Sequence, residues 1–249
     1  MTLATDPKSP MGYYSLINHP YQFIFFWNAK CGCSTLKKIF YEIAEGVFFS
    51  GDNIQTVMGY LNSHKYFVPK DELEQYGHYK KIIVVRDPWS RLVSFYINKT
   101  IFTNKESNLD IYGIFKAVNY SFHDIVHIML TMKPELFQHH LELQSSGLED
   151  IEFDRIILLS EMSRELPSVL QSLGVDIGKL RSLALHSNST TYDSSLTEKV
   201  MYLKPKEFEK FQQMPSFHSF YNEKLINIVA KIYERDLLKF NLTYPTNNR

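Results

Sequence analysis

Residues 21–43 constrain the fold of this chain more than any other stretch. They contain a run of five aromatic and branched residues, Phe23–Trp27, which is typical of a strand buried on both faces. A short loop with one lysine follows at residues 28–33. The apolar residues after the loop recur at helical spacing: Leu36, Ile39, Phe40 and Ile43. The stretch therefore predicts a buried strand, a tight loop and an amphipathic helix.

This strand, loop and helix together predict a binding site for a phosphate-like anion. We expect the helix to begin at Ser34 or Thr35, so that its first backbone N–H groups and the positive end of its dipole face the ligand. Lys30 adds a full positive charge beside them. In a P-loop the lysine directly precedes the hydroxyl residue, whereas here it precedes Gly32. The loop therefore resembles a P-loop without being one.

Residues 80–96 contain a second unit of the same kind. The short β-branched run at residues 82–85 predicts a buried parallel strand. Asp87 is a good helix N-cap, and Pro88 suits the first helical position. Arg86 then lies at the carboxyl end of the strand, where open α/β sheets bind their ligands, and Ser94 lies two turns into the helix.

The remaining pattern predicts one α/β domain over residues 1–249. A third strand at residues 155–159 precedes another helix, and the chain closes with further helical residues. Strands that alternate with helices indicate a three-layer arrangement, with a mostly parallel central sheet and helices on both faces. Residues 1–20 show little periodicity and are expected to be a leader. Residues 100–150 are polar and aromatic-rich, and we expect a helical insertion there.

Composition and charge exclude several functional classes. The 27 basic and 27 acidic residues give a net charge of zero, which argues against a general nucleic-acid-binding protein. No stretch resembles a signal peptide or a transmembrane segment, so we expect no membrane anchor and a cytoplasmic location. Cys31 and Cys33 are too close for an unstrained disulfide and suit reduced thiols. His123 and His127 share a helix face without the glutamate of zinc proteases, so we expect no metal site.

The two strand–helix units resemble those of the carbohydrate sulfotransferase superfamily, also called sulfotransferase family 2. That family carries a lysine, a glycine and a hydroxyl pair in its first loop, and residues 28–36 fit this pattern. The usual proline before the lysine is Ala29 here, and Cys33 stands between the glycine and the hydroxyl pair. The family's second element is a strand-ending arginine followed by Asp or Asn, Pro, an aromatic residue and Arg-Leu-Val-Ser. Residues 86–96 match it closely, and residues 232–240 look like the family's closing helix.

The resemblance implies a P-loop-NTPase-like sulfotransferase fold. It also implies transfer of a sulfuryl group from 3′-phosphoadenosine 5′-phosphosulfate to a hydroxyl by in-line displacement, without a metal. Lys30 would act on the oxygens of the reacting bond, while Arg86 and Ser94 would hold the 3′-phosphate. The 5′-phosphosulfate would be held by the first loop and helix start: Lys30, Cys31, Gly32, Cys33, Ser34 and Thr35. The product would be 3′-phosphoadenosine 5′-phosphate.

The family also uses a His or Glu between the two motifs as a general base that takes the acceptor's proton. We favour His64, while His78, Glu72 and Glu74 remain alternatives. Residues 183–195 form a loop rich in hydroxyl side chains. Two of its residues are candidates for a further nucleotide contact: Asn188 and Ser189. The acceptor, a glycan or a small molecule, would meet residues 100–150.

Two other functions remain open on the sequence alone. A nucleotide kinase or another NTPase on a related fold would also need an anion-binding loop, although the Walker lysine position is missing. A non-catalytic module would keep the nucleotide pocket and lack the base. Magnesium-dependent ATP turnover would identify the first, and nucleotide binding without transfer would identify the second.

Overall fold

A computed structural model describes residues 14–49, 53–63, 66–102, 120–137, 139–183, 192–193 and 198–246 of the chain. The chain divides into two compact units. Unit 1 comprises Met1–Val85 and Ser146–Asn188, and unit 2 comprises Arg86–Ser145 and Ser189–Arg249. Each unit is described below by itself.

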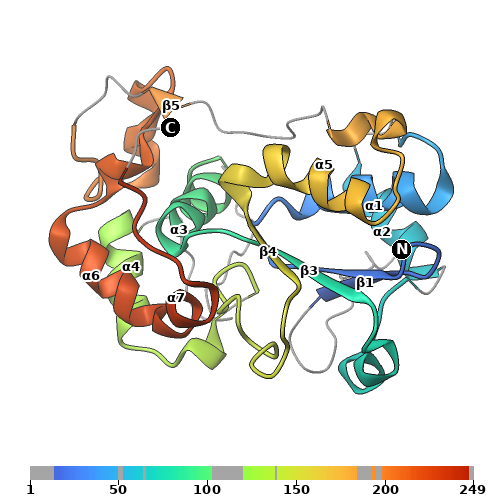
Figure 1. The fold of residues 1–249 in the computed structure, drawn as a ribbon. Helices are drawn as coiled ribbons and strands as arrows, with labels where there is room; N and C mark the ends of the chain where they lie inside the picture. Colours follow the sequence, from blue (N-terminus) through green and yellow to red (C-terminus); the bar gives the residue numbers. More distant parts are fainter. Residues whose placement is uncertain are drawn as a thin grey trace. The chain divides into compact units, whose positions relative to one another are not determined.

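Unit 1 is built on a four-stranded sheet with the order β1-β2-β3-β4 (Figure 1). Its strands are β1 (Tyr14–Asn18), β2 (Phe23–Trp27), β3 (Lys80–Val85) and β4 (Arg155–Leu158). β2, β3 and β4 are parallel, with Trp27 opposite Val84 and Val84 opposite Ile157, whereas β1 runs antiparallel to β2. The expected mostly parallel sheet is confirmed. Because the three parallel strands end in register, the loops that follow them begin at one edge of the sheet.

Helices cover one face of this sheet through an apolar core. The helices are α1 (Cys33–Glu45), α2 (Ile54–Ser63) and α5 (Met162–Ser172), which lie on the same side of the strands in Figure 1. Every residue of β2 is buried, as the aromatic run predicts. Alternate residues of the strands supply the core beneath the helices: Phe23, Phe25, Trp27, Ile82, Val84 and Ile157. The expected α/β architecture, a sheet flanked by helices, is therefore confirmed.

Short helical turns complete unit 1. They are η1 (Lys70–Tyr76), η5 (Leu159–Glu161), η6 (Ile177–Lys179) and η7 (Arg181–Leu183). Glu42 of α1 accepts a hydrogen bond from the backbone N–H of Ser182 at 3.0 Å, which holds η7 against that helix. Asp154 binds the start of β3 to the start of β4, since its carboxylate accepts from the Lys80 Nζ at 2.7 Å and from the Lys81 N–H at 2.9 Å.

Unit 2 is helical, with a separate apolar core. Its longer helices are α3 (Pro88–Tyr96), α4 (Phe122–Leu130), α6 (Glu223–Ile232) and α7 (Glu234–Phe240). Asp87 caps α3, with Pro88 at its start, as predicted. The shorter elements are the π-helical turn η2 (Ile97–Ile101), η4 (Pro134–Leu136), η8 (Pro205–Lys210), η9 (Phe217–Phe220), and the paired strands β5 (Tyr192–Asp193) and β6 (Met214–Pro215).

Two expectations from the sequence need correction. Residues 14–18, assigned above to a leader, form β1, because their backbone pairs with β2 and the side chains of Leu16 and Ile17 are buried. The helix after the first loop begins at Cys33, one residue earlier than expected. The chain closes with two helices, α6 and α7, which meet at Tyr233. Of the expected insertion at residues 100–150, the described part contains α4 and η4.

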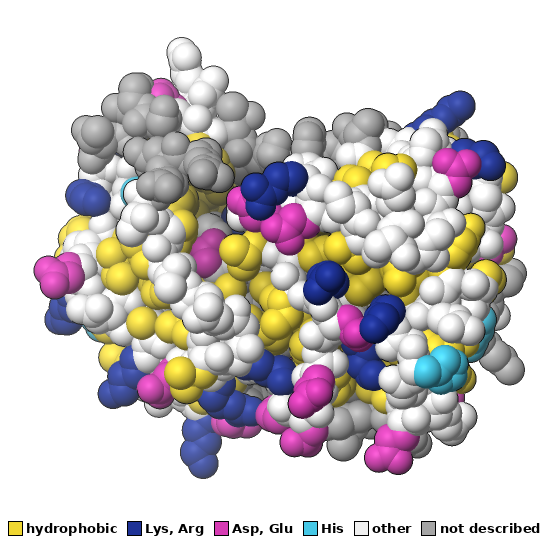
Figure 2. Space-filling view, viewed as in Figure 1, with side chains coloured by type: hydrophobic (Ala, Val, Ile, Leu, Met, Phe, Trp, Pro, Cys, Tyr) yellow, Lys and Arg dark blue, Asp and Glu magenta, His cyan; other side chains and the backbone are white. Residues whose placement is uncertain are grey.

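The described surface carries charges of both signs. On the face shown in Figure 2, basic and acidic side chains lie beside one another across the coloured surface. Arg164 on α5, for example, contacts Glu161 at 2.7 Å and Glu165 at 3.1 Å. None of the helices in the described ranges is long and apolar enough to cross a bilayer.

Candidate active site

The loop between β2 and α1 has an unusual backbone. Lys30 and Gly32 both adopt positive φ angles, 67° and 73°. Residues other than glycine rarely adopt such angles. The N–H of Cys31 donates to the carbonyl of Asn28 at 3.2 Å and closes a tight turn. The strain of a left-handed lysine is of the kind that concentrates at functional sites. The turn brings Lys30 directly before the start of α1.

Gly32 leaves the amino end of α1 open to an anion. It is the N-cap of the helix and has no side chain to accept hydrogen bonds from the first-turn N–H groups. No acidic residue lies in that turn. A Cβ on Gly32 would also lie 2.6 Å from Leu159 Cδ1 and 3.5 Å from Met162 Sδ. Both the φ angle and the space available therefore require glycine here, and the helix start suits a bound phosphate.

A second lysine, Lys37, lies close to this loop. Lys37 on α1 is only 4% exposed, and its Nζ lies 5.1 Å from the centre of the Trp27 ring. A cation over an indole face is stabilised by the ring's quadrupole, which offsets part of the cost of burial. Trp27 is the last residue of β2, so Lys37 adds fixed positive charge next to the point where the loop begins.

Arg86 is the first residue after β3, and its backbone is bound by a side chain. Its N–H donates to Gln144 Oε1 at 2.9 Å, and Gln144 Nε2 donates to its carbonyl at 2.7 Å. Gln144 has no exposed surface. The amide thus supplies the pair of hydrogen bonds that a neighbouring strand would otherwise give.

The Arg86 side chain is oriented along α3. Its Nε donates to Ser90 Oγ at 2.9 Å, and the Ser90 hydroxyl in turn donates to the Asp87 carboxylate in a short hydrogen bond. The Ser90 N–H also donates to Asp87 at 2.7 Å, as an N-cap requires. Ser94 is four residues beyond Ser90 and therefore lies on the same face of α3. Arg86 and Ser94, predicted as a pair, thus share one side of this helix.

A buried carboxylate supports the segment that carries Gln144. Asp236 of α7 has no exposed surface, and it accepts from the N–H groups of Gln144 and Ser145, each at 2.8 Å, and from Ser145 Oγ at 2.7 Å. Burial raises the pKa of Asp236, whereas the charge of Arg91 and these hydrogen bonds act in the opposite direction. Arg91 is 2% exposed and donates to the carbonyl of Glu142 at 2.7 Å.

The charge of Asp87 acts on three ring side chains of unit 2: His218, Tyr221 and Tyr244. Burial raises the pKa of Tyr221 well above its ordinary value, with the Asp87 charge adding to the effect. The Tyr221 hydroxyl donates to the carbonyl of Trp89 at 2.9 Å. Burial and the charge of Lys199 lower the pKa of His218, while the charge of Asp87 acts in the opposite direction.

One comparison with known proteins identifies the family. The model of the sulfotransferase family matches residues 14–245, nearly the whole chain. The chain belongs to the sulfotransferase family. This membership supports sulfotransferase activity in general and confirms the resemblance seen in the two motifs. Searches among curated proteins and among solved structures found no significant match.

The structure describes most of the site residues predicted for this sulfotransferase. The first loop and helix start hold one group together in unit 1: Lys30, Cys31, Gly32, Cys33, Ser34 and Thr35. Arg86 and Ser94 form a second group in unit 2. His64, Asn188 and Ser189 lie outside the described residues. Within the described ranges, no group of three or more His, Cys, Asp or Glu side chains is arranged to hold a metal ion.

The alternative general bases all precede β3 in the chain. His78 is exposed and precedes β3, and its ring packs against Tyr79 with centroids 4.7 Å apart. β3 is six residues long, or about 20 Å, and the Lys30 loop lies beyond the opposite end of its neighbour β2. Glu72 and Glu74 are exposed in η1, also before β3. The register of β2 and β3 thus separates His78 from the Lys30 loop, and the choice of general base stays a prediction.

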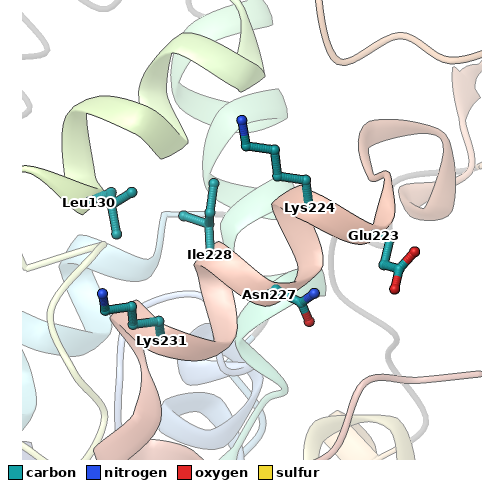
Figure 3. Close-up of a pocket in the computed structure, with 6 residues that line it drawn as sticks. All are labelled: Leu130, Glu223, Lys224, Asn227, Ile228 and Lys231. Carbon is teal, nitrogen blue, oxygen red and sulfur yellow. The ribbon is translucent and has the colours of Figure 1, made fainter.

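A shallow pocket of about 540 Å³ lies on α6, beside the end of α4 (Figure 3). Its lining combines two lysines with apolar and polar side chains: Leu130, Glu223, Lys224, Asn227, Ile228 and Lys231. No residue of either anion motif lines it, so we do not assign it to the nucleotide.

Four residues of these two regions were not predicted from the sequence. Ser90 lies within the second motif and Lys37 directly follows the first, and their spacing on the helices could have indicated them. Gln144 and Asp236 act on Arg86 from far along the chain, and no local pattern marks Gln144. Asp236 gives one signal, since it is an acidic residue among the apolar positions of the closing helix.

Proposed function

We propose that this sulfotransferase takes its sulfuryl group from 3′-phosphoadenosine 5′-phosphosulfate and transfers it to a hydroxyl of a glycan or a small molecule. The observation that carries the proposal is the start of α1, where no side chain caps the helix and where the preceding Lys30 has a left-handed backbone conformation. Such a helix start suits an anion. A second anion site at Arg86 supports a nucleotide with phosphates at two positions.

Lys30 and the start of α1 bind the 5′-phosphosulfate in this proposal. The N–H groups of residues 32–35 and the hydroxyls of Ser34 and Thr35 hold the 5′-phosphate, with Cys31 and Cys33 completing the loop. Lys30 contacts the oxygens of the bond that breaks. Negative charge grows on the leaving phosphate as sulfur departs, so a fixed cation there stabilises the transition state more than the ground state.

Arg86 and Ser94 bind the 3′-phosphate in this proposal. A guanidinium presents a planar fork of donors that matches phosphate oxygens, and Ser90 already directs that fork along the face of α3. Asn188 and Ser189 add a further nucleotide contact. Discrimination between nucleotides with and without the 3′-phosphate therefore depends on Arg86.

The transfer itself is an in-line displacement. The acceptor oxygen forms a bond to sulfur while the bond between sulfur and the 5′-phosphate oxygen breaks, and 3′-phosphoadenosine 5′-phosphate leaves. His64 takes the proton of the acceptor hydroxyl. Positioning and charge stabilisation supply most of the rate, by analogy with phosphoryl transfer.

Thermal unfolding in the presence of 3′-phosphoadenosine 5′-phosphate tests the donor assignment. A ligand that binds only the folded state raises its stability by about 2.7 kcal/mol at a hundred times its dissociation constant. We expect a clear rise in Tm for the wild-type chain, and no rise for Lys30→Ala or Arg86→Ala. Lys38→Ala, which removes a neighbouring positive charge on α1, is the matched control and should keep the rise.

The same experiment separates the other functions. If saturating nucleotide leaves the wild-type Tm unchanged, the donor assignment is wrong. Stabilisation by magnesium ATP together with ATP turnover would instead identify a nucleotide kinase or NTPase.

A further inference from the structure

The Arg86 site depends on a chain of buried hydrogen bonds that begins at Asp236 in α7. Asp236 fixes the backbone of Gln144 and Ser145, and the side chain of Gln144 fixes the backbone of Arg86. The partners are distant in sequence, since Asp236 is 92 positions after Gln144 and Gln144 is 58 positions after Arg86. Both supporting side chains have no exposed surface. They are therefore placed to hold Arg86 without contacting a ligand.

The side chain of Gln144 binds only the backbone of Arg86 in these two hydrogen bonds. Gln144 uses its carbonyl and its amino group on the same residue, at 2.9 Å and 2.7 Å. Two such bonds fix the peptide groups on both sides of the Arg86 Cα, and so they fix the direction in which the side chain leaves the backbone. Ser90 then holds the guanidinium at Nε. Arg86 is thereby constrained at its backbone and at its head group.

We propose that Gln144 and Asp236 are positioning residues for the Arg86 phosphate site, so that selection of a nucleotide with a 3′-phosphate depends on them. This inference rests on the proposed function. A bidentate arginine–phosphate contact tolerates only small errors in position and angle, and an arginine on an unfixed backbone would lose much of that contact. The loss should fall on the 3′-phosphate and leave the 5′-phosphate site in unit 1 unchanged.

Calorimetric titration of the full chain with two nucleotides tests the inference. 3′-Phosphoadenosine 5′-phosphate carries the 3′-phosphate, and adenosine 5′-monophosphate lacks it, so the ratio of their dissociation constants measures the contacts that Arg86 and Ser94 make to that phosphate. We expect a high preference for the first nucleotide in the wild type and almost none in Arg86→Ala. Gln144→Met keeps the size of the side chain and removes both hydrogen bonds. It should reduce the preference about tenfold while binding of the monophosphate is unchanged.

Further variants separate positioning from general stability. Gln144→Glu can still accept from the Arg86 N–H but cannot donate when ionised, so its preference should lie between those of the wild type and Gln144→Met. Asp236→Asn, which loses one acceptor, should also reduce the preference. Ser121→Ala, which removes the N-cap of α4 in the same unit, should lower stability and keep the preference. Adding Gln144→Met to Arg86→Ala should cause no further loss, because both changes act on one contact.

The outcomes are distinguishable. If Gln144→Met or Gln144→Glu folds cooperatively and keeps the wild-type preference while Arg86→Ala loses it, the positioning role is wrong and the proposed function stands. If the wild type binds both nucleotides equally, the assignment of Arg86 to a 3′-phosphate fails, and this inference fails with it.

Discussion

Gly32 is the residue whose identity the local geometry restricts most. Its φ of +73° is in the left-handed region, and a Cβ there would meet Leu159 Cδ1 at 2.6 Å. Gly46, at the other end of α1, has a similar φ of +70° with nothing within 4 Å of the same position. The two glycines therefore separate the cost of the backbone conformation from the cost of crowding.

We expect Gly32→Ala to destabilise the protein more than Gly46→Ala. The left-handed conformation costs each alanine about 1–2 kcal/mol. At position 32 the Leu159 side chain must also move aside, which adds about 1 kcal/mol. Urea unfolding of both variants measures the difference, and Gly32→Ala should in addition weaken nucleotide binding. Equal losses of stability would show that Leu159 moves without cost and would contradict the crowding argument.

At the scale of single residues, the sequence predicted candidate site residues that belong to short local motifs. Lys30, Gly32, Arg86 and Ser94 lie in short motifs whose spacing indicates a strand end or a helix start. Gln144 could not be predicted, because its role arises from pairing with residues 58 and 92 positions away. Such a pairing is set by tertiary packing, which a local pattern does not contain.

Among the elements, β3 and β4 are held together at their starts by Asp154. Partial burial alone would raise the pKa of Asp154, but hydrogen bonds from Lys80 and Lys81 and their charges outweigh it and lower the pKa. A depressed pKa in the folded state contributes stability above the unfolded pKa of about 3.9, and this stability is lost as the pH falls through the folded value.

Asp154→Asn should therefore destabilise the protein in a pH-dependent way. Because the Lys80 and Asp154 side chains are 58% and 35% exposed, solvent screens the pair, and we expect a loss of about 0.5–1 kcal/mol at pH 7. Denaturant unfolding at pH 7 and near pH 3 should show the difference from wild type shrink at the lower pH. Asp150→Asn, an exposed carboxylate nearby, is the control and should show no such difference. A loss that is the same at both pH values would contradict the assigned role of the charge.

The elements themselves were predicted unevenly. β2 and α1 were predicted nearly to the residue because a buried aromatic run and a helical stripe are strong signals. β1 was missed because a five-residue strand at a sheet edge carries little periodicity of its own.

At the scale of the whole molecule, the family match spans both compact units, from residue 14 to residue 245. The two anion motifs lie in different units, with Lys30 in unit 1 and Arg86 in unit 2. Val85 and Arg86 are adjacent in the chain, so the boundary between the units falls where β3 ends. The expected single domain over residues 1–249 stays a prediction.

The central claim is that this sulfotransferase moves a sulfuryl group from 3′-phosphoadenosine 5′-phosphosulfate to a hydroxyl. The most direct measurement is transfer of labelled sulfate from that donor to a panel of glycans, lipids and phenols. We predict a labelled product with at least one hydroxyl acceptor, release of one 3′-phosphoadenosine 5′-phosphate per transfer, and loss of both in Lys30→Ala. If the wild type binds the nucleotide but labels no acceptor, a non-catalytic nucleotide-binding module would be the better description, and the claim would be contradicted.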